Sequence, residues 1–334
     1  MLTNRQLSHR LPVMRIEIWA DMVCGWAHIG KRRLEKALAS WEGEPVEVVW
    51  RPFQIDPSAP AKAEPLAGLL SDPMVEEALQ VCSPGLSPSD NRARVAGIAA
   101  GEGLGAQWGA TWRPNTLDAH RLIALAYETG GAALQSAVVE RVLTAHFVQT
   151  LDIGDPGVLS AIAAESGVPW DGRGADLVRE LLLTGKAKGV RTSPTIVVGG
   201  RALAGAQPPD VIRDFLADAA GQPARRLPAE VERLRHAESL LDQRDPLGAL
   251  TLLRPLLDEH GTDRGVRLLA ARAYFASAQL GRARTALEEL VADVPDDSYV
   301  RHLLGRTLQR QGRPEEAATH LTLAAVMTPD YGDL

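Results

Sequence analysis

The segment "RIEIWADMVCGWAHIGKRRLEKAL", residues 15–38, decides the fold of the first part of the chain. Its opening residues alternate apolar and polar side chains around Ile16 and Ile18, which predicts a β-strand. From about Cys24 onward, Ile29 and the apolar residues after it follow the spacing of a buried helix face. The run "VEVVWRPF" then supplies a second strand. Because a helix joins the two strands, we expect them to pair in parallel.

The sequence that follows predicts a thioredoxin-like core with a helical insert. Residues from about 62 to 186 have a helical pattern, clearest in "DAHRLIALAYET" and "ALQSAVVERVLTAHFV". The run "PTIVVGGRALAG" predicts two strands around a tight turn at Gly199 and Gly200. A helix over about 210–220 follows this hairpin. We therefore expect an α/β thioredoxin-like domain over residues 14–221.

The C-terminal part of the chain repeats after the linker-like sequence "GQPARRLPAE". Ala249, Ala283 and Ala317 are 34 residues apart, and a leucine four residues after each alanine keeps the same period. A helix-turn-helix unit of this length is typical of tetratricopeptide repeats. We expect an all-α domain of three such repeats, at residues 230–263, 264–297 and 298–331.

Composition and charge exclude several classes of protein. The chain has 334 residues and a net charge of -6, so it lacks the basic surface of a nucleic-acid-binding protein. Its two cysteines are too few for a disulfide framework, which favours a reducing compartment. The N-terminal residues lack the apolar core of a signal peptide, and no stretch reaches the roughly 20 apolar residues of a membrane span. We therefore expect a cytoplasmic protein with neither nucleic acid nor membrane as a partner.

Three motifs, in the same order along the chain, resemble the DsbA superfamily, in particular its FrnE-like cytoplasmic branch. They are "CGWAHIGKRRLEKAL", "NTLDAHRLIALA" and "GVRTSPTIVVGGRALAGAQPP". The active site usual for the branch is Cys-Pro-Trp-Cys followed by Tyr-Ile-Gly. Cys24 and Trp26 match this pattern, whereas Gly25, Ala27 and His28 replace its proline, second cysteine and tyrosine. The resemblance implies a thioredoxin fold, but the second sulfur of a dithiol redox site is missing.

Cys24 is the expected nucleophile. The N–H groups and the positive dipole end of a helix N-terminus favour an anion, so we expect a stabilised thiolate. With Ala27 in place of a second cysteine, a mixed disulfide on Cys24 cannot be resolved within the motif. Cys82 lies in a loop-like stretch, and we expect a structural thiol there rather than a resolving one. An engineered Ala27 is a further alternative, although the changes at Gly25 and His28 favour natural divergence.

Three functions remain open for a site with one thiol. A thiolate can add reversibly to a conjugated enone or polyene thioester, and the resulting single bond rotates before elimination. We favour such a cis-trans isomerase, acting on a small molecule or on an intermediate tethered to a carrier protein. The first alternative is disulfide exchange, the thiol-disulfide oxidoreductase activity that the resemblance implies. The second is a non-catalytic protein whose repeats bind a partner.

Three residues are expected to act beside the thiol of Cys24. Ser193 and Pro194 lie at the start of the run that predicts the hairpin, and His28 lies in the cysteine motif. In "TSPT" the resemblance implies a cis proline at Pro194, facing Cys24. Ser193 then offers backbone groups to a bound substrate. His28, one turn into the helix, is a candidate for proton exchange during addition and elimination. A solvated helix histidine is an equally good interpretation of His28.

Further candidates are polar and aromatic. His120 in the "DAHR" motif and Asp21 before the cysteine are candidate substrate-binding residues, with core packing and helix capping as their alternatives. Trp26, Trp108 and Trp112 are candidates for an apolar pocket around a conjugated ligand, and the last two are equally candidates for core packing. The scattered histidines predict neither a metal nor another cofactor.

The first helix of each tetratricopeptide repeat lines the concave face of such an array. By the spacing of the family, this face contains three arginines and aromatic or apolar residues. They are Leu268, Arg272, Tyr299, His302, Arg306 and Arg310. We expect an acidic protein or peptide as a partner, because guanidinium groups bind carboxylates. An array used only for packing or dimerisation is the alternative.

Overall fold

The chain folds into two compact units. The computed structural model describes residues 13–69, 77, 84–221 and 227–331. The first unit consists of Met1–Gly185 and Gly189–Arg225, and the second of Lys186–Lys188 and Arg226–Leu334.

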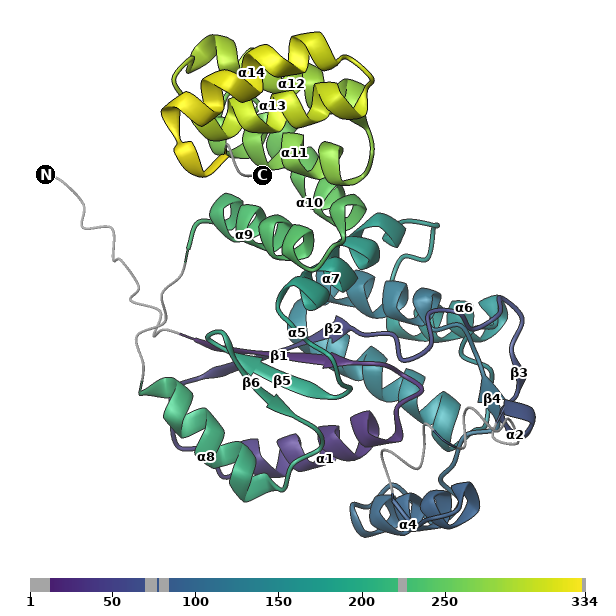
Figure 1. The fold of residues 1–334 in the computed structure, drawn as a ribbon. Helices are drawn as coiled ribbons and strands as arrows, with labels where there is room; N and C mark the ends of the chain where they lie inside the picture. The colour runs from purple at the N-terminus through teal and green to yellow at the C-terminus, as the bar shows by residue number, and fades with distance from the viewer. Residues whose placement is uncertain (1–12, 70–76, 78–83, 222–226, 332–334) are drawn as a thin grey trace, which may run out of the picture. The chain divides into compact units, whose positions relative to one another are not determined.

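A four-stranded sheet forms the centre of the first unit (Figure 1). Its strands are Met14–Ala20 (β1), Val46–Pro52 (β2), Thr195–Val198 (β5) and Arg201–Ala204 (β6). Their order is β2-β1-β5-β6, with β1 and β2 parallel and the other two pairs antiparallel. This order confirms the predicted parallel pair and the hairpin. At its turn, Gly199 and Gly200 have φ values of 57° and 87°, which glycine adopts without steric cost.

Helices cover both faces of this sheet. The described helices of this unit are Gly25–Ala39 (α1), Leu66–Leu69 (α2), Pro88–Gly101 (α4), Leu117–Phe147 (α5), Pro156–Ser166 (α6), Ala175–Ala187 (α7) and Pro209–Ala220 (α8). On one face, Ile16 and Ile18 of β1 share a core with α1 and α8, which pack together (Figure 1). On the other face, Trp19 lies against Gly185 of α7, where a Cβ atom would come within 2.6 Å of the indole.

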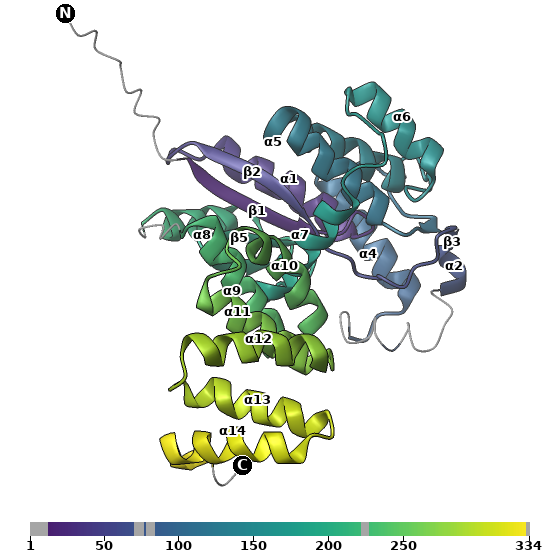
Figure 2. The same ribbon diagram turned by 90° about the horizontal axis from the view of Figure 1, so that it is seen from above.

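Part of the insert, with α2 and α4, lies beyond the end of the sheet where β1 leads into α1 (Figure 2). Two short strands there, Glu64–Pro65 (β3) and Trp112–Arg113 (β4), pair antiparallel. The sequence did not predict them, because two residues are too few to show an alternating pattern. Helix α5 packs against β2 and is interrupted at Gly130 and Gly131. Its length and apolar composition alone would let it cross a membrane, but this break and its packing on the sheet indicate a core helix.

The second unit is built from helix pairs. They are Ala229–Asp242 (α9) with Pro246–Glu259 (α10), Arg264–Ala276 (α11) with Leu280–Asp293 (α12), and Ser298–Arg310 (α13) with Pro314–Met327 (α14). The equally spaced Ala249, Ala283 and Ala317 are all buried, as the repeat predicts. At Gly305 a Cβ atom would lie 2.6 Å from Leu321, so the small residue is needed where α13 and α14 approach.

Candidate functional site

Cys24 lies at the N-terminus of α1, as the sequence predicted. It is the N-cap residue, with extended backbone angles of φ -83° and ψ 111°, and its carbonyl oxygen accepts the first helical hydrogen bond from the N–H of Ala27 at 2.9 Å. Its side chain is only 7% exposed. The thiol donates a hydrogen bond of 3.3 Å to the carbonyl oxygen of Ser193. The sulfur is therefore held at the edge of the core rather than in open solvent.

The expectation of a stabilised thiolate at Cys24 is wrong in direction. Burial raises the pKa of this thiol above its ordinary value of 9.0, and the nearby Asp21 carboxylate raises it further. Hydrogen bonds with Ser193 and with the α1 backbone act in the opposite direction but do not compensate. A helix N-terminus favours an anion by about 1 kcal/mol or less, whereas full burial can shift a pKa by several units. The thiol is consequently protonated at neutral pH.

Hydrogen bonds join the segment before Cys24 to the loop that contains Ser193 and Pro194. The Ser193–Pro194 peptide is cis, as predicted from the "TSPT" motif. The backbone N–H of Asp21 donates to the Ser193 hydroxyl at 2.9 Å. Together with the bond from Cys24, this contact fixes Ser193 beside the start of α1.

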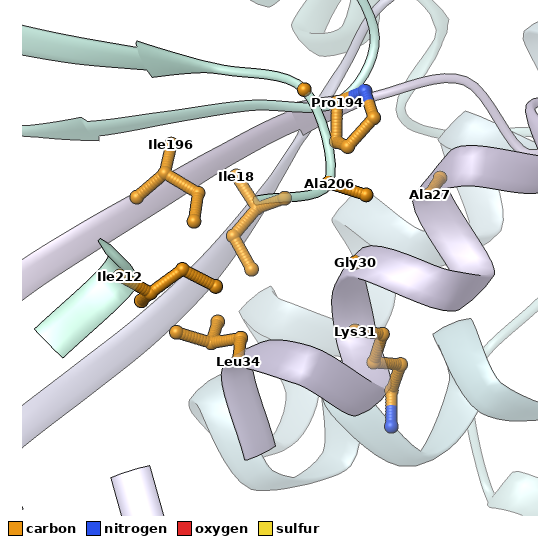
Figure 3. Close-up of a pocket in the computed structure, with 10 residues that line it drawn as sticks. Ile18, Ala27, Gly30, Lys31, Leu34, Pro194, Ile196, Ala206 and Ile212 are labelled. Carbon is orange, nitrogen blue, oxygen red and sulfur yellow. The ribbon is translucent and has the colours of Figure 1, made fainter. Parts of the chain in front are cut away.

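Ala27, which replaces the second cysteine, is completely buried and lines a small cavity (Figure 3). The cavity has a volume of about 10 Å³, and Gly30, Pro194 and Ala206 lie on the same side of it as Ala27. Such a volume holds about one water molecule and no substrate. The methyl group of Ala27 therefore offers a packing surface and no second nucleophile.

His28 is not the solvated helix histidine that the sequence left open, because its side chain is buried. It is 1% exposed, and its Nδ1 accepts a hydrogen bond of 3.2 Å from the indole N–H of Trp108. Its Nε2 lies 3.6 Å from a carboxylate oxygen of Glu140. Both ring nitrogens thus face partners other than Cys24, so His28 is a positioning residue for Trp108.

Glu140 on α5 is a functional residue that the sequence did not reveal. Burial opposes its charge, but hydrogen bonds from His28 and Lys31 hold the pKa of Glu140 far below its ordinary value. Lys31 contacts the carboxylate at 2.9 Å, and Arg32 contacts it as well. Glu140 is therefore ionised, and it lies against the Nε2 side of His28.

Asp21, three residues before Cys24, and His120 of the insert form a second buried polar contact. Asp21 is 1% exposed, and one of its oxygens accepts from the N–H of Ile55 at 2.7 Å. Nε2 of His120 lies 3.3 Å from the other oxygen and 2.9 Å from the carbonyl oxygen of Phe53. His120 is 2% exposed, so it is a satisfied packing histidine as well as the partner of Asp21.

His146 near the end of α5 is a further buried histidine that sequence reasoning missed. Burial lowers the pKa of His146 to about 4, against a smaller opposing effect of the Asp21 charge. Its ring makes an edge contact with Phe147, with ring centroids 4.6 Å apart. The only signal in the sequence is a histidine within the apolar run "ERVLTAHFV".

The tryptophans considered as pocket walls have distinct surroundings. Trp26, next to Cys24 in the motif, is half-buried, and the guanidinium of Arg94 lies 5.7 Å from its ring centre. Trp108 is buried and stacks on Phe147, with ring centroids 4.6 Å apart and an interplanar angle of 11°. Trp112 on β4 donates to the carbonyl oxygen of Thr150 at 3.0 Å.

Cys82, the other cysteine, lies outside the described residues. Among the residues that are described, no group of three or more His, Cys, Asp or Glu side chains is arranged to hold a metal ion.

The predicted partner face of the repeats contains three arginines, and they differ in the groups that their side chains contact. Arg272 contacts the carboxylates of Glu238 and Asp242 at 3.4 and 3.8 Å. Arg310 donates to the carbonyl oxygen of Phe275 at 2.8 Å. Arg306 is exposed, and among residues 227–331 no ion pair of its side chain is found. Of the remaining positions, Leu268 and His302 are half-buried and Tyr299 is exposed.

His302 and Arg306 are close neighbours on this face. The ring of His302 stacks on Tyr331, with centroids 4.6 Å apart. Burial and then the charge of Arg306 lower the pKa of His302. The positive charge of this face is therefore carried by Arg306 rather than by His302.

Comparison with known proteins gives relatives of the first unit. The chain is 24% identical over 220 residues to the uncharacterized protein YwbO of Bacillus subtilis, covering 61% of this chain and 96% of that protein. A probable DsbA oxidoreductase from Streptomyces coelicolor is 27% identical, with a TM-score of 0.53, covering 65% of this chain and 94% of the other. A 2-hydroxychromene-2-carboxylate isomerase is 15% identical, with a TM-score of 0.41, covering 62% and 94%.

Family models match both parts of the chain. The model of the tetratricopeptide repeat matches residues 240–307, where the helix pairs and the 34-residue period were found. The model of the DSBA-like thioredoxin domain matches residues 15–217, which contain the sheet, the insert and Cys24. The chain therefore belongs to the family of DSBA-like thioredoxin domain proteins, and carries tetratricopeptide repeats after that domain.

Proposed function

We propose that the protein is a thiol-dependent isomerase in which Cys24 adds reversibly to a conjugated double bond. The observation that carries this proposal is a buried thiol at the first turn of α1 with a methyl group, Ala27, in the place of a second sulfur. The DSBA-like family includes oxidoreductases, so thiol chemistry at this position is the natural starting point.

The addition balances with Cys24 alone once its thiol has ionised. The sulfur forms a bond to the β-carbon of an enone or unsaturated thioester, and the thiol proton goes to the enolate that results. The former double bond is then single and rotates. Elimination breaks the carbon–sulfur bond and returns the proton to Cys24, so that neither an oxidant nor a second thiol is consumed.

Disulfide exchange, the runner-up, is less well supported by the site. Both reactions need the thiolate form of Cys24, so the raised pKa of this thiol does not distinguish them. Exchange also needs a second thiol to release the mixed disulfide, and Ala27 stands where the motif would supply it. The hydrogen bond from the thiol to the carbonyl oxygen of Ser193, in the loop that the resemblance assigns to substrate binding, favours testing exchange as well.

The test measures conversion of the Z isomer of benzylideneacetone to the E isomer by chromatography. We expect turnover with the wild-type chain and with Cys82→Ser, and a loss of at least about a thousand-fold with Cys24→Ser. Exchange between glutathione and a peptide mixed disulfide is measured in parallel. Exchange that depends on Cys24, with no isomerisation, would replace this proposal with the runner-up.

For the repeats we propose an acidic partner, such as the acidic surface of a protein that carries the substrate. Arg306 supports it, because its exposed guanidinium is free of ion pairs within the described part of the repeats. The probe is a fluorescein-labelled penta-glutamate peptide, with binding followed by anisotropy. Arg306→Gln should weaken binding several-fold, whereas Arg313→Gln, whose guanidinium pairs with Glu316, should leave it unchanged. Equal effects of the two variants would contradict a specific face.

A further inference from the structure

Trp108 occupies the space above the first turn of α1. A Cβ atom at Gly25 would lie 2.6 Å from Cη2 of its indole, closer than atoms can approach. The glycine at this position is what allows the ring to lie there. The residue beside Cys24 is therefore covered by an aromatic ring from the insert, and Cys24 itself is 7% exposed.

The indole is held on three sides. Its N–H donates to His28 at 3.2 Å, and its face stacks on Phe147 at 4.6 Å. The next backbone N–H, that of Gly109, donates to the carbonyl oxygen of Phe147 at 2.8 Å. His28 is in turn oriented by the ionised Glu140. The ring is thus fixed by its contacts, and it moves away from the first turn of α1 only if these contacts change.

We propose that Trp108 determines which molecules reach Cys24, admitting small flat electrophiles and excluding bulky electrophiles and protein disulfides. This inference rests on the proposed function of Cys24 as a nucleophile. Aromatic rings lie around the turn that carries the thiol: Trp108, stacked on Phe147, lies against Gly25, and the half-buried Trp26 is two residues after Cys24. A planar conjugated molecule stacks on such rings, whereas a folded polypeptide cannot enter beneath them.

The expected slowing of bulky reagents follows from the fraction of molecules in which the ring of Trp108 has moved away. A molecule that fits beside the indole reacts with the closed protein, whereas a bulky one reacts only when the ring has moved away. Minor conformations of this kind are typically about 0.1–10% populated. A bulky reagent is therefore slowed by at least about ten-fold relative to a small one of the same chemistry.

The experiment compares the rates at which N-methylmaleimide and N-pyrenylmaleimide alkylate Cys24, read by intact mass in a Cys82→Ser background. Glutathione supplies the ratio of the two rates for an uncovered thiol. We expect the wild-type ratio to exceed that of glutathione by at least about ten-fold. Trp108→Ala should bring the ratio close to that of glutathione, and Trp108→Phe, which keeps the stack on Phe147, should lie in between.

Trp41→Ala is the matched control. Trp41 follows the other end of α1, packs on the same core and donates to the carbonyl oxygen of Glu44 at 2.9 Å, so its loss also removes a packed indole. We expect an unchanged rate ratio for this variant. An unchanged ratio in folded Trp108→Ala, or an equal change in Trp41→Ala, overturns the role of Trp108. A second readout, Gly25→Ala, should lower the ratio by displacing the ring without removing it.

The two proposals fail separately. A wild-type protein that is selective for the small maleimide but does not isomerise the enone contradicts the proposed function alone. Isomerisation with equal maleimide rates contradicts the role of Trp108 alone. A native thiol that neither reagent modifies, in wild type and Trp108→Ala alike, overturns both.

Discussion

Replacing Gly25 with alanine tests the contact between α1 and Trp108 directly. Carbon atoms in contact are ordinarily about 3.5–4.0 Å apart, whereas the added Cβ would lie 2.6 Å from the indole. The ring must therefore retreat by about 1 Å. Because its hydrogen bond to His28 is already 3.2 Å long, such a shift breaks it.

The cost follows from these contacts. Overpacking of a core costs roughly 1–3 kcal/mol, and the lost hydrogen bond adds about 0.5–1.5 kcal/mol. The better helix propensity of alanine offsets up to about 1 kcal/mol. We therefore expect Gly25→Ala to lower the free energy of unfolding by about 1–3 kcal/mol.

Urea unfolding followed by tryptophan fluorescence measures this change, since all 7 tryptophans precede the repeats. Gly97→Ala is the matched control, because Gly97 also lies within a helix, α4, and nothing lies within 4 Å of its Cβ position. We expect this control to be stabilised by up to about 1 kcal/mol. Equal stability changes in the two variants would refute the close approach of Trp108 and the argument built on it.

Three further predictions concern the buried groups of the site. Burial raises the pKa of Cys24 above 9.0, so in Cys82→Ser its rate of alkylation by iodoacetamide should still rise between pH 8.5 and 9.5; a plateau below pH 8 contradicts this. The pKa of His146 is lowered from 6.5 to about 4 in the folded protein, so the unfolded chain binds a proton at a higher pH than the folded chain does. The free energy of unfolding should therefore fall by up to about 3 kcal/mol as the pH drops from 6.5 to about 4. Urea unfolding at pH 7 and pH 4.5 should show a flatter dependence for His146→Gln. Ala27→Cys should form a disulfide with Cys24 on mild oxidation, because residues three apart on a helix are close enough to be bridged; an intact mass that stays at the reduced value contradicts it.

Local patterns predicted most of the fold. The alternation in β1, the helical spacing after Cys24 and the glycine pair of the hairpin each depend on neighbouring residues, and each is confirmed. The repeats were predicted for the same reason, because each unit packs only against its neighbours. The family motif added the cis Pro194, which propensity alone does not reveal.

The candidate site was predicted less completely, because it depends on contacts across the chain. Trp108 and Gly25 are 83 residues apart, and Glu140 reaches His28 from another helix of the insert. No periodicity reports such contacts. The direction of the Cys24 pKa was wrong for the same reason: the helix N-terminus is visible in the sequence, whereas the burial of the thiol depends on residues far along the chain, such as Ser193.

Two of the departures from the family motif act together on one ring. Gly25 provides the space for Trp108, and His28 accepts the hydrogen bond from its indole N–H. A proline at position 25 would occupy that space, and a tyrosine at position 28 would not present the same ring nitrogen. The departures at positions 25 and 28 thus both act on Trp108, and a substitution confined to Ala27 does not account for them. On the proposed role of Trp108, Ala27 is the expected companion of Gly25 and His28, because a thiol that protein disulfides do not reach has no need of a resolving cysteine.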